Sequence, residues 1–321
     1  MQMGIIHMQF QEKLKSSDME RRGFIKRIGL GSALVGAAGA VSIPALASSK
    51  KQAAPFTMDF APHFGMFKNH APGGIVDELR FMADQGFRSL EDNGLLKRSE
   101  ADQELIGKTL SDLGMRMGVF VIDGGDNWKV SLTTGKQDFL DTFLKTCRDS
   151  VEAAKRVNAK WMTVVPGYFE RNLPMGVQTG NVIEALKRGA EIFEPHGLTM
   201  VLEPLSDNPD LFLRHADQTY MICKAVGSPS CKILYDIYHM QRNEGNLIAT
   251  MEKTWSEIAY IQIGDNPGRK EPGTGEINYS NVFEWVNKKG FDGILGMEHG
   301  NAQPGKEGEL ALIEAYRKVD V

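Results

Sequence analysis

The feature that most constrains the fold is a regular alternation of short apolar runs with longer amphipathic stretches, which continues from Phe56 to the end of the chain. The short runs are rich in β-branched residues and predict strands, whereas the longer stretches carry apolar residues at helical spacing. The eight predicted strands are 56–60, 87–91, 116–122, 160–165, 199–203, 232–236, 260–264 and 293–298. The predicted helices are 75–85, 101–113, 138–157, 182–195, 217–226, 247–257 and 281–289, with an eighth that ends near Val319.

Repeated strand–helix units build either a closed parallel barrel or an open doubly wound sheet. Eight consecutive units without a Gly-rich phosphate-binding fingerprint favour closure. Four predicted helices run into Gly86, Gly114, Gly197 and Gly290, where a left-handed C-cap lets the chain turn into the next strand. The predicted fold class is therefore α/β, a single (β/α)8 TIM barrel formed by residues 56–321.

Composition excludes several other classes of protein. With 42% hydrophobic and 24% charged residues, the chain has the balance of a globular domain and not that of a disordered or membrane-spanning protein. The only cysteines are Cys147, Cys223 and Cys231, an odd number without metal-ligand spacing. A disulfide framework is therefore not expected.

Residues 1–47 precede the alternating pattern and have the features of a targeting segment. Arg21 and Arg22 are followed by a Gly/Ala-rich apolar run, 28–43, and by the cleavage-like sequence Ala-Leu-Ala at 45–47. This order resembles a twin-arginine signal, which is read by the twin-arginine export machinery and carries folded proteins to the periplasm. We predict cleavage after Ala47 and a linker over 48–55. An uncleaved membrane anchor is the alternative, which the glycines and serines of the apolar run disfavour.

Removal of the leader leaves an acidic protein. Residues 1–47 contain six Lys/Arg and three Asp/Glu, so their loss takes the formal net charge from −4 to −7. No basic stripe remains that would bind a phosphate backbone, and nucleic acid is not an expected partner. We expect a small-molecule ligand and no stable membrane insertion after cleavage, and the oligomeric state, a homo-oligomer included, stays open.

Acidic or amide side chains end four of the later predicted strands. They are Glu203, Asp236, Gln262 and Glu298, separated by 33, 26 and 36 residues, which is one strand–helix unit each time. In a barrel of this kind the carboxyl ends of the strands form the active face, so the four side chains are expected to converge. A charge beside the barrel core is costly unless a metal or a partner neutralises it. We therefore predict one divalent metal ion, and the oxygen donors favour Mg²⁺ or Mn²⁺.

The chain resembles the hydroxypyruvate isomerases, which belong to the xylose-isomerase-like superfamily of sugar isomerases and epimerases. The resemblance rests on YDIYHMQ at 235–241, IQI at 261–263, DNPGR at 265–269, EPGTGEINY at 271–279 and GME at 296–298. It is strongest over 199–298 and weaker over 56–167. The run from DNPGR to EPGTGEINY is its most specific part.

The resemblance implies roles for particular residues. Glu203 and Glu298 would be the paired acid/base carboxylates and also metal ligands, while Asp236 and Gln262 would complete the metal set. Gln262 occupies a position that is histidine in many related epimerases. His239 and Arg269 would bind substrate oxygens.

Two further residues are candidate substrate-binding residues on position alone. Glu91 ends the second predicted strand, where it would contact a substrate group or a neighbouring ligand, and His63 lies in the first strand–helix loop. The sequence departs from the family after Glu91, because it has Asp-Asn-Gly at 92–94 where hydroxypyruvate isomerases have an aromatic and apolar segment. The departure concerns the substrate and not the metal.

The expected activity is metal-dependent isomerisation of a small hydroxy-carbonyl compound, hydroxypyruvate or a related sugar or sugar acid, by proton transfer between two glutamates. Two alternatives remain open. One is a ketose 3-epimerase of the same superfamily, which uses the same residues. The other is an exported sugar-acid binding protein without turnover. A DNA-repair endonuclease is not expected, since seven histidines, His7 among them in the leader, do not provide a multi-zinc site.

Overall fold

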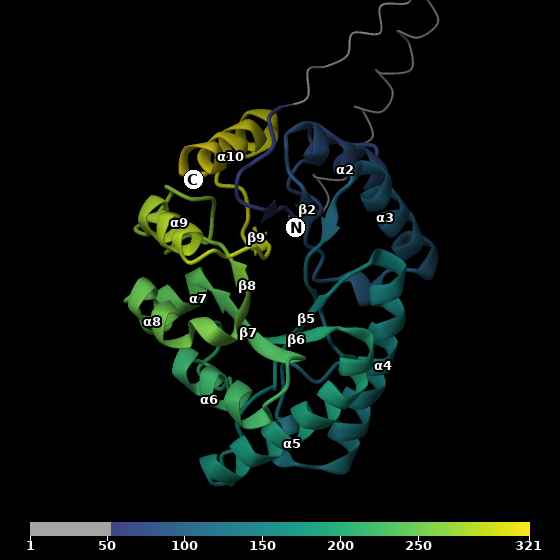
Figure 1. Cartoon of the computed structure of the whole chain (residues 1–321), viewed down its shortest axis with the longest axis vertical. Helices are drawn as coiled ribbons and strands as arrows, with labels where there is room; N and C mark the ends of the chain where they lie inside the picture. The colour runs from purple at the N-terminus through teal and green to yellow at the C-terminus, as the bar shows by residue number, and fades with distance from the viewer. Residues whose placement is uncertain (1–52) are drawn as a thin grey trace, which may run out of the picture. The chain divides into compact units, whose positions relative to one another are not determined.

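The computed structural model describes residues 53–321, so the predicted signal peptide, and the predicted linker as far as residue 52, lie outside the described residues. Within the described part, strands and helices alternate along the chain, and the helices lie on the outside of the strands (Figure 1). Among these residues, no helix has both the length and the hydropathy required to cross a bilayer.

The secondary structure is as follows. The strands are β1 (Phe60–Ala61), β2 (Ser89–Leu90), β3 (Arg116–Met117), β4 (Phe120–Val121), β5 (Trp161–Val164), β6 (Thr199–Leu202), β7 (Cys231–Asp236), β8 (Ile258–Gln262) and β9 (Leu295–Gly296). The α-helices are α2 (Ile75–Asp84), α3 (Glu100–Leu113), α4 (Gln137–Val157), α5 (Met175–Phe193), α6 (Ala216–Val226), α7 (Ile237–Asn243), α8 (Leu247–Thr254), α9 (Tyr279–Lys288) and α10 (Gly305–Val319). Short 3-10 helices occupy Leu95–Lys97, Leu132–Thr134, Glu194–His196 and Trp255–Glu257.

The strands form a curled parallel sheet. Seven of them are hydrogen-bonded in the order β1-β9-β8-β7-β6-β5-β4, and β2 pairs with β3 in a second parallel ladder. The second ladder joins the first through a parallel bridge between His63 and Glu91, whose backbone N–H donates to the Pro62 carbonyl at 2.9 Å. On the other side, the Val121 N–H donates to the Asn93 carbonyl at 3.3 Å. The predicted TIM-barrel fold is confirmed.

Apolar side chains fill both faces of the sheet. The larger core lies between the strands and the surrounding helices, and it includes the fully buried rings of Phe60, Phe120 and Phe283. A smaller cluster is formed by Ala61, Val119, Val201, Leu234, Tyr260 and Ile294, which come from separate strands or strand ends. These residues form a close-packed interior, which makes the barrel a solid support for the side chains at its rim.

Several predicted boundaries were wrong. The first strand begins at Phe60 and not at Phe56, because the Thr57 and Met58 N–H groups donate to the Asp320 carboxylate near the C-terminus. The third strand is divided into β3 and β4 around Gly118, where the Tyr260 hydroxyl occupies the space that a Cβ would take. α5 begins at Met175, seven residues before its predicted start.

Other local predictions were confirmed. Gly86, Gly114, Gly197 and Gly290 all have positive φ angles, between 64° and 90°, as the predicted turns into the next strand require. The three cysteines are buried and free. Helix α7 was not predicted as a helix, and it begins immediately after β7 because the Asp236 side chain accepts the Tyr238 and His239 N–H groups and acts as its N-cap.

Candidate active site

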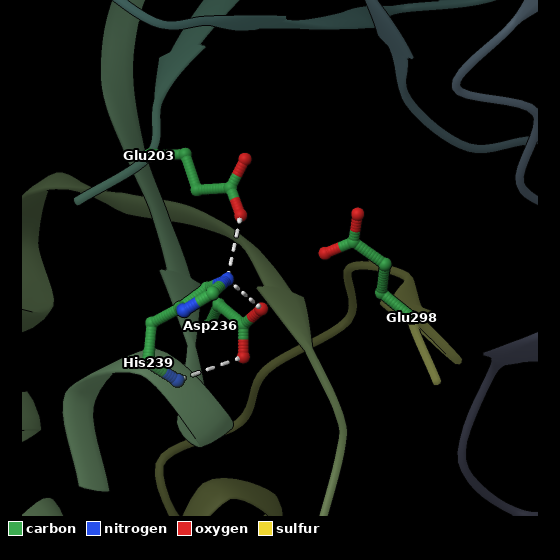
Figure 2. A group of neighbouring side chains, drawn as sticks. All are labelled: Glu203, Asp236, His239 and Glu298. Atoms are coloured by element: carbon green, nitrogen blue, oxygen red, sulfur yellow. Dashed lines mark hydrogen bonds and ion pairs between the residues drawn. The ribbon is translucent and has the colours of Figure 1, made fainter. Parts of the chain in front are cut away.

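Four polar side chains meet at the carboxyl ends of the late strands. Ligating atoms of Glu203, Asp236, His239 and Glu298 all lie within 4.8 Å of one another. In Figure 2, Glu203 and Glu298 enter from different sides, and Asp236 and His239 lie below Glu203. Glu203 directly follows β6, Asp236 ends β7 and Glu298 stands two residues after β9. The structure therefore brings together three of the four predicted metal ligands and one predicted substrate-binding residue.

Gln262, the fourth predicted ligand, occupies the strand position between them. It is the register partner of Asp236 across β7 and β8, and of Gly296 across β8 and β9. Its Nε2 donates to Glu91 Oε1 at 2.9 Å, and its Oε1 is buried without a hydrogen-bond partner. The hydrogen bond to Glu91 therefore fixes the orientation of the Gln262 amide, so that Nε2 faces Glu91 and Oε1 is the free acceptor.

Glu91 lies in the barrel interior and not in the cavity. Its side chain is 1% exposed and accepts hydrogen bonds from Gln262 and from the Tyr260 hydroxyl, the latter at 3.0 Å. Burial raises the pKa of Glu91 to about 7. These contacts assign Glu91 to the support of Gln262, which is the second of the two roles that the sequence left open, contact with a neighbouring ligand and not with substrate.

The three carboxylates create a strong local need for positive charge. Burial, together with the neighbouring carboxylates, raises the pKa of Glu203 well above its ordinary value, and burial raises that of Glu298 likewise. Arg269 is the cation that contacts the group: its Nη2 lies 2.7 Å from Glu298 Oε2 and 3.3 Å from Asp236 Oδ2. Because the Arg269 guanidinium contacts only the carboxylates of Glu298 and Asp236, Glu203 has no contact with a guanidinium group among the described residues.

Unpaired polar atoms show that the residues fit a divalent ion. Glu203 Oε1 and Gln262 Oε1 are both buried and lack hydrogen-bond partners. A buried polar atom left unpaired costs about 1–3 kcal/mol, which coordination would recover. With Asp236 and Glu298, these atoms make a hard, all-oxygen donor set of the kind that Mg²⁺ and Mn²⁺ prefer.

His239 could offer an imidazole ligand to the same ion, but its hydrogen bonds indicate another role. The Ser206 backbone N–H donates to His239 Nδ1 at 3.2 Å, so Nδ1 is the acceptor and Nε2 carries the proton of the neutral ring. Burial lowers the pKa of His239, which favours this neutral form. Nε2 lies 3.4 Å from Asp236 Oδ2 and 3.8 Å from Glu203 Oε1. An N–H donor at this place suits a substrate oxygen better than a metal.

The loop that carries Arg269 is held rigidly by Asp265, which is fully buried. The carboxylate of Asp265 accepts the N–H groups of Gly273, Gly275 and Ile277 at 2.8–3.1 Å. Most residues of the DNPGR and EPGTGEINY segments therefore stabilise the conformation of one loop and do not bind a ligand. Arg269 Nε also donates to the Glu298 carbonyl at 3.1 Å, which directs the guanidinium toward the carboxylates.

A cavity of about 360 Å³ opens over these residues. Glu203, His239, Arg269 and Glu298 line it, whereas Glu91 does not. His63 lies elsewhere: its ring contacts the Phe64 and His299 carbonyls, and it lines a neighbouring hollow beside α10. The structure does not place it in the cavity with the two glutamates.

Further residues from the loops after β2, β4 and β6 line the cavity. The sequence did not assign Lys97, Asp123, Asn127 and Asp207 to the site, whereas Asn93 was expected near the substrate and Trp128 was a weaker candidate from its place in an early strand–helix loop. Asn93 Nδ2 donates to Glu298 Oε1 at 2.9 Å, and its own Oδ1 is buried and unpaired. The sequence places these residues just after predicted strands, where site residues of a barrel are expected. Many other loop residues share that position, so the sequence alone could not identify the ones that line the cavity.

A parallel barrel with clustered carboxylates at the carboxyl ends of its strands has the architecture of a TIM-barrel enzyme. Residues 79–319 match the model of the xylose isomerase-like TIM barrel family, and the chain belongs to that family. The expected fold family is thereby confirmed.

Curated relatives are named isomerases. The chain is 37% identical to hydroxypyruvate isomerase of Escherichia coli over 138 residues, which are 42% of this chain and 53% of that protein. It is 28% identical to 2-oxo-tetronate isomerase of Cupriavidus necator over 259 residues, which are 78% of this chain and 95% of that protein. These names confirm the expected enzyme class.

A solved structure shows the same fold at greater evolutionary distance. The E. coli 3-keto-D-glucoside 4-epimerase aligns with a TM-score of 0.67 and 19% identity, over 82% of this chain and 98% of that one. At this level of identity the likeness concerns the fold alone.

Proposed function

We propose that the chain is a metal-dependent isomerase that moves a carbonyl group between adjacent carbons of a small sugar or sugar acid. The observation that carries the proposal is the pair of carboxylates, Glu203 buried and Glu298 partly buried, which enter one cavity from different sides (Figure 2). The names of the curated relatives, hydroxypyruvate isomerase and 2-oxo-tetronate isomerase, support a sugar-acid substrate.

Proton transfer between the two carboxylates accounts for the reaction. One glutamate removes the proton from the hydroxyl-bearing carbon, and the electron pair of that C–H bond forms the C=C bond of an enediolate as the carbonyl π-electrons move to oxygen. The other glutamate, which is protonated at the start, gives its proton to the former carbonyl carbon, and the C=C electron pair forms the new C–H bond. The hydroxyl proton of the first carbon passes to the other oxygen, so that the first oxygen becomes the new carbonyl, and exchange with solvent restores the protonation states of the two glutamates. Burial raises the pKa of both Glu203 and Glu298, which makes each carboxylate a stronger base than an exposed one.

The remaining side chains hold the reacting groups. One divalent ion would be bound by Glu203, Asp236, Gln262 and Glu298. When bound, the ion would stabilise negative charge on the substrate oxygens, which is worth several kcal/mol. His239 Nε2–H donates to a substrate oxygen. Arg269, which the carboxylates orient, would pair with a substrate carboxylate or hydroxyl group.

Replacement of each glutamate by glutamine tests the proposal. Glu203→Gln and Glu298→Gln keep the side-chain size and one oxygen donor but cannot take a proton, so each should lower turnover by at least about 10²-fold. The assay is proton NMR in deuterated water on a panel of keto acids and ketoses, with Glu104→Gln on the exposed face of α3 as the matched control.

The same assay separates the alternatives. Exchange and inversion at one carbon, without carbonyl migration, would identify an epimerase. Stoichiometric binding with neither exchange nor turnover would identify a binding protein. Isomerisation at the wild-type rate by the double glutamine variant would exclude the paired-carboxylate mechanism.

A further inference from the structure

The cavity is larger than the smallest proposed substrate requires. Its volume of about 360 Å³ falls within the range of about 300–1,000 Å³ of pockets that hold drug-sized ligands, which is more than a three-carbon keto acid needs. The reacting carbons must lie against Glu203 and Glu298, so the remaining space is on the side of the loops after β2, β4 and β6. The residues of those loops decide what else the substrate carries.

Trp128 is the aromatic side chain exposed at this cavity. Among the large hydrophobic side chains that are exposed in residues 53–321, it is the only aromatic one, with 52% of its surface accessible. A single exposed hydrophobic residue needs no explanation by itself, but this one lines the candidate active site. An indole ring offers a flat apolar face with a negative quadrupole, against which the C–H groups of a carbohydrate pack favourably.

The backbone on both sides of Trp128 is fixed. The buried side chain of Asn127 donates to the Ile122 carbonyl at 3.0 Å, and the Lys129 carbonyl accepts the Tyr168 N–H at 2.9 Å. Val130 also forms a parallel bridge with Tyr168. The exposed ring is therefore carried by an anchored segment, which lowers the entropy cost of using it as a binding surface.

The charges around Trp128 indicate a neutral ligand. Asp123 and Asp207 both line the cavity, and Lys97, which is 77% exposed, has its ammonium 3.4 Å from Asp123 Oδ2. Asp207 has His239 Nε2, 3.7 Å away, as its one ionic neighbour within 4.0 Å among the described residues. Lys97 compensates the charge of Asp123, but Asp207 has no Lys or Arg partner within 4.0 Å among the described residues, so a phosphate or second carboxylate would be repelled beside it. Hydroxyl groups, in contrast, can donate hydrogen bonds to both carboxylates.

We propose that Trp128, Asp123 and Asp207 form a distal subsite for the neutral, polyhydroxylated part of a sugar, so that the physiological substrate is a five- or six-carbon sugar and not a three-carbon keto acid. The inference rests on the proposed function, because it takes the carboxylate pair as the place of reaction. It adds the substrate class and a residue that determines specificity.

The test compares substrates of different length in four proteins: wild type, Trp128→Ala, Trp128→Phe and Leu105→Ala. Leu105 is an exposed hydrophobic residue on α3 outside the cavity, and it serves as the control. Trp128→Ala should lower kcat/KM for a ketohexose about tenfold through KM, with a much smaller loss for hydroxypyruvate, because only the longer substrate reaches the ring. Trp128→Phe should restore part of the loss.

A binding measurement tests the subsite independently of the proposed reaction. Titration with an unreactive hexitol should change the tryptophan fluorescence of wild type and Leu105→Ala saturably, and the change should be absent in Trp128→Phe, which keeps the other three tryptophans. If wild type turned over no compound while this signal persisted, the proposed reaction would fail and the subsite would stand.

Equal losses for hydroxypyruvate and ketohexose, or no loss for either, would overturn the subsite. The subsite would also be overturned if Trp128→Ala caused equal losses and changed a dimer to a monomer in analytical ultracentrifugation. The ring would then contact a second copy of the chain.

Discussion

Asp236 shows how one side chain links local structure to the site. Its Oδ1 accepts the Tyr238 N–H at 2.7 Å and caps α7, while its Oδ2 faces Arg269 and His239. Removing the whole carboxylate would therefore remove a helix cap, worth about 1 kcal/mol, as well as a metal ligand.

Asp236→Asn separates these two contributions. The amide oxygen can keep the cap, but the negative oxygen that faces the site is lost, so we expect the purified variant to lose the divalent ion and to have nearly the thermal stability of metal-free wild type. Metal analysis by mass spectrometry and circular dichroism measure the two effects. Wild-type metal content in both Asp236→Asn and Asp236→Ala would contradict the assignment of this ligand.

Glu91 gives a prediction for the pH dependence of stability. Its pKa is about 7 in the folded protein and 4.5 ordinarily, so between these values the folded state holds a proton that the unfolded chain has released. Glu91 should therefore contribute a fall of about 3 kcal/mol to the free energy of unfolding of the metal-free protein as pH rises from about 4.5 to about 7, in addition to the falls from Glu203 and Glu298, whose pKa values are also raised.

Glu91→Gln should flatten this part of the dependence, because glutamine is neutral throughout and can still accept from Gln262 Nε2. Urea unfolding at about pH 5 and pH 8 measures it, with the exposed Glu104→Gln as control. An undiminished slope in Glu91→Gln would show that other groups produce it.

At the scale of the elements, strand β9 has a glycine where the barrel interior leaves no room. A Cβ on Gly296 would overlap Glu91 Oε2 and approach the Tyr260 ring. Gly180 in α5 is the opposite case, an exposed helical glycine with nothing within 4 Å of the Cβ position. The two residues make a matched pair for the same substitution.

Gly296→Ala should lower the free energy of unfolding by about 3 kcal/mol, since both close neighbours are buried and cannot move aside. Gly180→Ala should instead raise it by up to about 1 kcal/mol, because alanine is the better helix former. Thermal melts compare them. A Gly296→Ala protein as stable as wild type would mean that the Glu91–Tyr260 contact is not tightly packed.

At the scale of the whole molecule, contacts between the two ends of residues 53–321 complete the barrel. The Asp320 carboxylate accepts the Thr57 and Met58 N–H groups, and Glu309 on α10 accepts those of Asn69 and His70. The site depends on this closure, because β9, which precedes Glu298, pairs with β1 on one side and β8 on the other. A chain that must fold completely before its site exists suits export in the folded state.

We propose on this basis, and on the leader sequence, that the protein is exported through the twin-arginine machinery to the periplasm. Replacement of both Arg21 and Arg22 by lysine should leave uncleaved precursor in the cytoplasm, as cell fractionation and immunoblotting would show. Undiminished periplasmic protein in the double variant would rule out this route.

The sequence by itself determined the fold class and the strand ends that carry the site. Alternating periodicity is a local property, and in parallel strands the carboxyl ends must lie on one face, so Glu203, Asp236, Gln262 and Glu298 could be predicted to converge. Four glycines at positive φ were predicted for the same reason, because the backbone geometry of a helix end depends on neighbouring residues.

Only the tertiary structure decided the roles of the surrounding residues. Glu91 and His63 stand at strand ends like the ligands, but their partners come from distant segments, Tyr260 and Gln262 for the one and His299 for the other. The proton position on His239 follows from the Ser206 N–H, 33 residues away in the chain. Such contacts depend on how separate loops pack together, which cannot be predicted from the spacing of residues in the sequence.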